Sequence, residues 1–189
     1  MLKILLLSHK SEYFHRLHAY LNSMNVNVTV KVPSPSLSFE GFDGVILSGG
    51  SLAKDSYKGV LSWYSSVIPK LDIPVLGICL GFKILGACYQ ARIRRLEVDE
   101  HGVKNVEFFR DFALLPGRKR LAVYEDHSFE LIGPQYPLEN YGDSDQCKVQ
   151  AIKHVDKPQF AVQFHPEVTE ENEGHLVLDG FIQYCKRNQ

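Results

Sequence analysis

The sequence predicts an α/β fold in which helices cover both faces of a mainly parallel sheet. Three observations lead to this prediction: apolar runs typical of buried strands, amphipathic stretches between them, and alternating strand patterns in the second half. Parallel strands are buried on both faces, so they form nearly continuous apolar runs. The second half is expected to add antiparallel strands to this core. Residues 1–189 are expected to form a single domain.

The first half alternates between expected strands and helices. Apolar side chains recur every three or four residues in two stretches, which predicts helices over 11–24 and 57–71. A period of two over 26–32 indicates a strand near the edge of the sheet. The other expected strands cover 3–8, 43–50 and 73–78.

The second half has shorter strand patterns joined by turns, and these are the expected antiparallel additions. An amphipathic stretch over 172–187 predicts a closing helix. The expected strands cover 91–98, 103–109, 120–126, 147–154 and 159–165.

Composition excludes several classes of function. The formal net charge of −1 leaves no excess of cations to neutralise nucleic-acid phosphates or to bind a membrane surface. No run reaches the roughly 18 apolar residues of a membrane helix, and the apolar N-terminus is too short for a signal peptide. The four cysteines show no C-x-x-C spacing. A reduced, cytoplasmic setting without nucleic-acid or membrane partners is expected.

Cys79 lies between two glycines, in "GICLG" (77–81), where an apolar strand is followed by a helical pattern. This is the pattern of a nucleophile elbow, in which small neighbours let the chain turn sharply and present the nucleophile. The N-terminus of the following helix favours a thiolate. The alternative is that Cys79 is an ordinary buried small apolar side chain.

A candidate base for this thiol lies in "FAVQFHPEV" (160–168), an apolar strand ending in His165, Pro166 and Glu167. Glu167 could accept the imidazole N–H and hold the tautomer of His165, as the third member of a triad does. A strand end stopped by proline is the structural alternative. The His-x-Glu pair could also be half of a metal site, but no second cluster of His, Cys or Asp residues has the spacing of metal ligands. No metal and no cofactor are expected.

Glycines also follow the expected strand over 43–50, in "LSGGS" (47–51). Such a turn leaves backbone N–H groups free to face a site, as an oxyanion hole requires. It is not a phosphate-binding loop, because no Gly-Lys-Ser or Gly-Lys-Thr follows.

Together these segments resemble the class I, triad-type glutamine amidotransferases over essentially the whole chain. "PVLGICLGF" resembles the family's nucleophile segment, "ILSGGS" its oxyanion strand and "AVQFHPEV" its His-x-Glu segment. Within the family, "YFHRLHAYL" and "CKVQAIKHVDKPQFAVQFHPEV" are most similar to the separate glutaminase subunits of GMP synthases. The resemblance implies a flavodoxin-like three-layer core.

The resemblance also implies roles for individual residues. Cys79 would attack the side-chain amide of glutamine and form a γ-glutamyl thioester, His165 would be the general base and acid, and Glu167 would orient it. The backbone N–H groups of Gly50 and Leu80 would form the oxyanion hole. The ammonia would pass to an ATP-dependent synthetase partner, since the chain has no ATP-binding loop. Further substrate-binding candidates are Gly49, Gly81, Lys83 and His127.

The sequence departs from the family at the positions expected to recognise the substrate. Lys83 replaces the glutamine that helps to bind substrate in the family. Its ammonium either stabilises the Cys79 thiolate, meets a different acidic group, or turns to solvent from the first helical turn. "EDHSFE" keeps His127, but Asp126 replaces a serine and Phe129 replaces an aspartate. Two other functions therefore stay open: a thiol hydrolase of γ-glutamyl compounds, and a non-catalytic regulator with the same fold.

Overall fold

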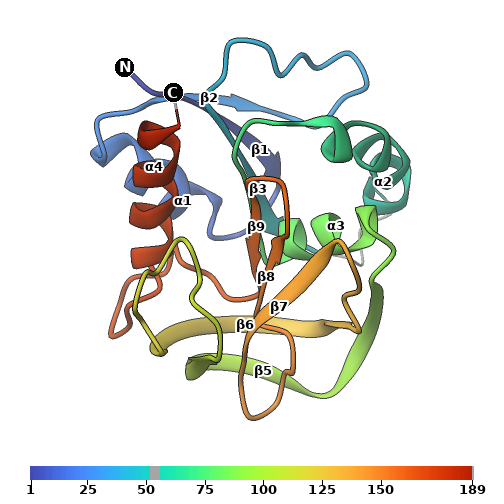
Figure 1. Ribbon diagram of the computed structural model, residues 1–189, viewed down its shortest axis with the longest axis vertical. Helices are drawn as coiled ribbons and strands as arrows, with labels where there is room; N and C mark the ends of the chain where they lie inside the picture. Colours follow the sequence, from blue (N-terminus) through green and yellow to red (C-terminus); the bar gives the residue numbers. More distant parts are fainter. Residues whose placement is uncertain (52–55, 189) are drawn as a thin grey trace.

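The computed structural model describes residues 1–51 and 56–188, and these form one nine-stranded mixed sheet with helices on both faces (Figure 1). The strand order is β2-β1-β3-β4-β9-β8-β7-β5-β6. The strands are β1 (Lys3–His9), β2 (Asn27–Lys31), β3 (Gly44–Gly50), β4 (Val75–Ile78), β5 (Arg92–Phe108), β6 (Arg120–Ile132), β7 (Leu138–Asp143), β8 (Ala151–His154) and β9 (Gln159–Val162). The α/β prediction, with a largely parallel core and antiparallel additions, is confirmed.

The parallel half of the sheet consists of β2, β1, β3, β4 and β9. Every residue of β4 and β9 is buried, as expected for strands covered on both faces. By contrast, β2 lies at the edge of the sheet and is half-buried or exposed, as its alternating pattern predicted. The carboxyl ends of the four central parallel strands therefore meet at one edge of the core.

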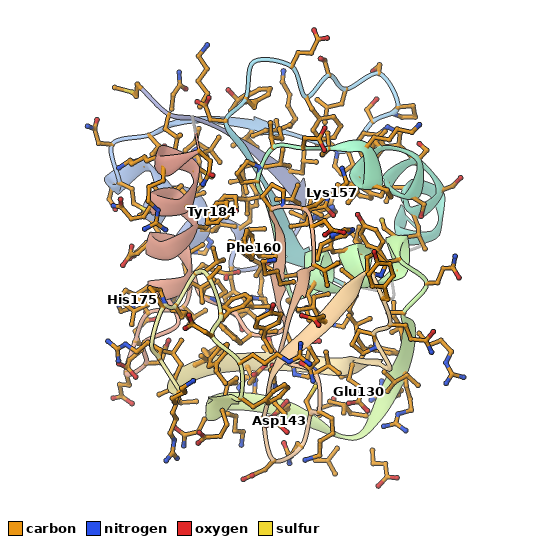
Figure 2. The ribbon with its side chains drawn as sticks, in the orientation of Figure 1. Glu130, Asp143, Lys157, Phe160, His175 and Tyr184 are labelled. Atoms are coloured by element: carbon orange, nitrogen blue, oxygen red, sulfur yellow. The ribbon has the colours of Figure 1, made fainter. Side chains whose placement is uncertain are left out.

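The helices cover the two faces in pairs. α1 (Phe14–Ser23) and α4 (Leu176–Arg187) lie on one face, whereas α2 (Ser56–Val67) and α3 (Leu80–Cys88) lie on the other (Figure 1). Successive side chains of β1 alternate between these two layers, as in any strand: Ile4 packs on the α1 and α4 side, and Leu5 on the α2 and α3 side. On the first face, the rings of Phe160 in β9 and Tyr184 in α4 have centroids 5.0 Å apart (Figure 2).

The expected helix over 57–71 divides into two elements. α2 ends at Val67 and a short 3₁₀ helix, η1 (Ile68–Lys70), continues the chain. Pro69 is tolerated in the first turn of η1, where its missing N–H has no intrahelical partner, but it cannot continue α2. None of the described helices has the length and apolar character needed to cross a membrane.

The second half differs from the sequence prediction in three ways. The expected strands over 91–98 and 103–109 form one long strand, β5, with a register shift between Arg95 and Glu100. β7 had no expected counterpart. The strand expected over 159–165 ends at Val162. It pairs antiparallel with β8, as expected, and it also pairs in parallel with β4, so it joins the two parts of the sheet. Its apolar run is typical of a strand buried on both faces.

Candidate active site

A cavity of about 500 Å³ lies where the central parallel strands end. This is the edge at which open α/β sheets place their sites. Strands β1, β3, β4 and β9 each contribute the residues that follow them, and β6 closes the other side. The lining includes Gly50, Cys79, Leu80, Lys83, His127 and His165. With Arg95 of β5, the structure thus brings together six segments that are far apart in the sequence.

Cys79 occupies the sharp turn between β4 and α3, with φ 48° and ψ −92°. Such a conformation is strained for a residue with a side chain and is held by the packing around it. The neighbouring glycines are required for this packing. A Cβ on Gly77 would lie 2.5 Å from the carbonyl oxygen of Gly81, and one on Gly81 would lie 2.3 Å from that of Leu47. The strand-turn-helix geometry predicted for this segment is confirmed.

The thiol of Cys79 is buried beside a lysine. Nζ of Lys83 lies 3.8 Å from Sγ and 3.3 Å from the carbonyl oxygen of Cys79. Lys83 is itself only 2% exposed, so the interpretation that it turns to solvent is wrong. Burial alone would raise the pKa of the thiol, but the nearby charges of Lys83 and His165 outweigh it and lower the pKa to about 7.

His165 follows β9, and its Nδ1 lies 2.9 Å from a carboxylate oxygen of Glu167. Both residues are buried. Burial opposes the charged imidazole, but the Glu167 carboxylate and the Cys79 sulfur raise the pKa of His165 well above its usual value. The ring of Tyr13 packs edge-on against that of His165, with centroids 4.8 Å apart. This arrangement fixes the imidazole beside the thiol.

The glycine-rich end of β3 approaches the same imidazole. A Cβ on Gly49 would lie 2.9 Å from Cε1 of His165, so only glycine fits without a shift. Gly50 and Leu80 both line the cavity next to Cys79. Leu80 is the first residue of α3, so its N–H has no partner within the helix. Gly81, in contrast, packs against Leu47 and is not part of the cavity lining.

His127 lines the cavity from β6 and lies between two buried carboxylates. Its Nε2 is 3.0 Å from Glu100 and 3.1 Å from Glu125, and Nδ1 is 3.1 Å from the carbonyl oxygen of Phe129. Burial opposes its charge, but the two carboxylates raise the pKa of His127 to about 9. Glu100, His127 and Cys147 have ligand atoms within 4.8 Å of one another. They are the described residues that could hold a metal ion, although the carboxylates already satisfy the imidazolium.

Several residues of the site were missed in the sequence. The amide Nε2 of Gln163 lies 3.8 Å from Sγ of Cys79, and its position two residues before His165 was an available signal, since alternate residues of an extended segment share a side. Tyr13 also donates a hydrogen bond of 2.8 Å to Asp126. Glu125 gave no signal, because its burial depends on how β6 packs against the core.

The family model for class-I glutamine amidotransferases matches residues 5–184. The chain belongs to this family. The resemblance inferred from the "GICLG" and "FHPE" segments is thereby confirmed. This class-I glutamine amidotransferase has relatives of nearly the same length. It is 30% identical to the glutamine-hydrolyzing GMP synthase subunit of Methanothermobacter thermautotrophicus, over 98% of the chain and 100% of the relative. It is 31% identical to the corresponding protein of Methanococcus aeolicus, with 96% and 97% covered.

Solved structures agree with this assignment. A Thermoplasma acidophilum protein ascribed to the same GMP synthase subunit superposes with a TM-score of 0.91 at 28% identity, over 100% of this amidotransferase chain and 96% of that one. A Thermotoga maritima glutamine amidotransferase superposes with a TM-score of 0.74 at 21% identity, over 99% and 83% of the two chains. At that identity the second match supports the fold alone.

Proposed function

We propose that the protein is a glutaminase that releases ammonia from the side chain of glutamine and supplies it to a synthetase partner. The observation that carries the proposal is the buried cluster of Cys79, His165 and Glu167 at the carboxyl edge of the parallel strands. The names of the two archaeal relatives supply the substrate and the type of assembly, since those proteins are GMP synthase subunits that hydrolyse glutamine.

The proposed acylation starts from a thiolate and an imidazolium. The Cys79 thiolate attacks the amide carbon, and the oxyanion accepts hydrogen bonds from the backbone N–H groups of Gly50 and Leu80. The C–N bond breaks as His165 gives its proton to the leaving nitrogen, which departs as ammonia. The products are a γ-glutamyl thioester and a neutral imidazole, whose remaining N–H is held by Glu167.

The thioester is then hydrolysed by water. His165 takes a proton from the water as the oxygen attacks the thioester carbon, and the C–S bond breaks. The thiolate and the imidazolium are restored, and glutamate leaves. Because the reactive form needs the thiolate, activity is expected to fall as the pH drops through about 7, where Cys79 becomes protonated.

The deciding experiment measures ammonia released from glutamine, with and without the ATP-dependent synthetase that the organism pairs with this chain. Wild type is expected to release ammonia, the synthetase to increase the rate, and Cys79→Ala to abolish it. Cys88→Ala is the matched control, because it removes a half-buried thiol from the other end of α3. Lys83→Gln tests whether the family's usual residue increases the use of glutamine.

Two outcomes would contradict the proposal. Faster release of glutamate from γ-glutamyl peptides than from glutamine would indicate a thiol hydrolase of γ-glutamyl compounds. No release from either substrate with any synthetase, and no reaction of Cys79 with a glutamine-mimicking electrophile, would indicate a non-catalytic regulator.

A further inference from the structure

Lys83 occupies a position in which an ammonium group is costly unless it is paired. The residue is 2% exposed, and its Nζ contacts the carbonyl oxygen and the sulfur of Cys79. Among the side chains that the structure describes, no carboxylate oxygen lies within 4.0 Å of this Nζ. A buried charge without a counter-ion destabilises a protein by several kcal/mol. The sulfur is the nearest group that can become an anion.

The other cations around the sulfur already have carboxylate partners. His165, after β9, is paired with Glu167. His127, on β6, lies between Glu100 on β5 and Glu125 on β6. Both imidazoles therefore have carboxylate partners, whereas Lys83 contacts the carbonyl oxygen and the sulfur of Cys79.

The other groups that contact the sulfur are uncharged. Gln163 offers an amide N–H at 3.8 Å, and Asp126 presents its backbone carbonyl at 4.0 Å. The carboxylate of Asp126 is instead directed to Tyr13 and His101. An amide donor and an ammonium both favour the ionised sulfur over the thiol.

We propose that Lys83 is the counter-ion of the Cys79 thiolate and keeps the nucleophile ionised before substrate binds. This role rests on Cys79 being the nucleophile of the proposed function. In the usual cysteine–histidine pair the imidazolium is the cation that stabilises the thiolate. Here a second basic side chain contacts the sulfur from α3, whereas the proton that reaches the leaving group comes from His165.

The test is the pH dependence of Cys79 alkylation by iodoacetamide, followed by mass spectrometry of the labelled peptide between pH 5 and pH 9.5. The alkylation rate reports the thiolate fraction and needs no glutamine turnover. Wild type is expected to show a midpoint near pH 7. Lys83→Met is expected to move the midpoint up by at least one pH unit, which lowers the rate at pH 6 about tenfold. Lys83→Arg is expected to keep the wild-type midpoint.

His165→Gln separates the two cations, and it is expected to move the midpoint less than Lys83→Met does. Protection of the buried Cys147 and Cys185 from labelling reports that each variant is folded. Lys83→Gln, with a polar side chain, replaces the methionine variant if that one fails to fold. An unchanged midpoint without Lys83, or a midpoint that depends on His165 alone, overturns the inference. A normal alkylation profile in a protein that releases no ammonia would overturn the glutaminase proposal and leave this one standing.

Discussion

At the scale of single residues, the sulfur of Cys79 has charged neighbours of two kinds. One is the imidazole of His165, which transfers protons in the proposed mechanism, and the other is the amine of Lys83, which has no proton-transfer role in it. A thiolate stabilised in this way is a weaker nucleophile but a better leaving group. Where the thiolate is fully formed, Lys83 should therefore affect the two halves of the reaction in opposite directions.

At pH 9.5, where Cys79 is ionised with or without Lys83, Lys83→Met is predicted to increase the steady-state fraction of enzyme held as the γ-glutamyl thioester. Without the ammonium, the departing sulfur is less stabilised, so thioester breakdown slows relative to its formation. The measurement is rapid quenching during glutamine turnover, followed by intact-protein mass spectrometry. Lys83→Arg is the control that keeps the charge, and an adduct fraction equal to wild type in the methionine variant would contradict the prediction.

The sequence predicted which candidate catalytic residues lie together better than it predicted their surroundings. Cys79, His165 and Glu167 stand at the ends of apolar segments, so the parallel topology alone places them at one edge. The direction of Lys83 could not be predicted in this way. A lysine four residues after the cysteine reaches either solvent or the sulfur, and the choice depends on the strands that cover α3.

At the scale of elements, α4 shows how closely a helix can approach a loop. A Cβ on Gly180 would lie 1.9 Å from the carbonyl oxygen of Leu114, which is a backbone atom. Phe181 and Ile182 on the same helix are fully buried against this side of the sheet. The glycine thus lets α4 contact the segment that connects β5 and β6.

Gly180→Ala is predicted to lower the free energy of unfolding by about 1–3 kcal/mol, because backbone must move to accept the methyl group. The effect opposes helix propensity, which favours alanine over glycine by about 1 kcal/mol. Gln183→Ala, at an exposed position of α4, is the control and is expected to change stability little. Urea denaturation of both variants checks this, and a stabilised Gly180→Ala protein would contradict it.

Elements of the first half were more predictable than those of the second. Strands β1, β3 and β4 are local apolar runs, and their length and boundaries follow from composition. β5 alternates irregularly between buried and exposed residues along its length. Its course depends on partners on both sides, β7 and β6, and no window of sequence contains that information.

At the scale of the whole molecule, the buried group of Glu100, His127 and Glu125 links the last two strands of the sheet. The imidazolium joins β5 to β6 beneath the cavity. The pKa of His127 is raised to about 9 from an unfolded value of 6.5, so its stabilising contribution is complete below pH 6.5 and is lost as the pH rises through 9. This shift corresponds to at most about 3 kcal/mol.

His127→Gln is predicted to lower the free energy of unfolding substantially at pH 6.5 and less at pH 9.5. His165 contributes to wild-type stability in the same pH range, so the difference between wild type and the variant isolates His127. Urea unfolding at several pH values provides the measurement. His101→Gln, at an exposed histidine of β5, is the matched control. A difference in unfolding free energy between wild type and the His127 variant that stays the same at every pH would contradict the prediction.

The two glycines around Cys79 also limit how the protein can be altered. The nearest atom that each one faces is a carbonyl oxygen of the main chain, in Gly81 and Leu47 respectively. A clash with a side chain can be relieved by shortening that side chain, but every amino acid carries the same carbonyl group. Substitutions at Gly77 or Gly81 should therefore have no second-site suppressor at the residue they contact. Libraries for directed evolution of this site should vary Ile78 and Leu80 and leave both glycines unchanged.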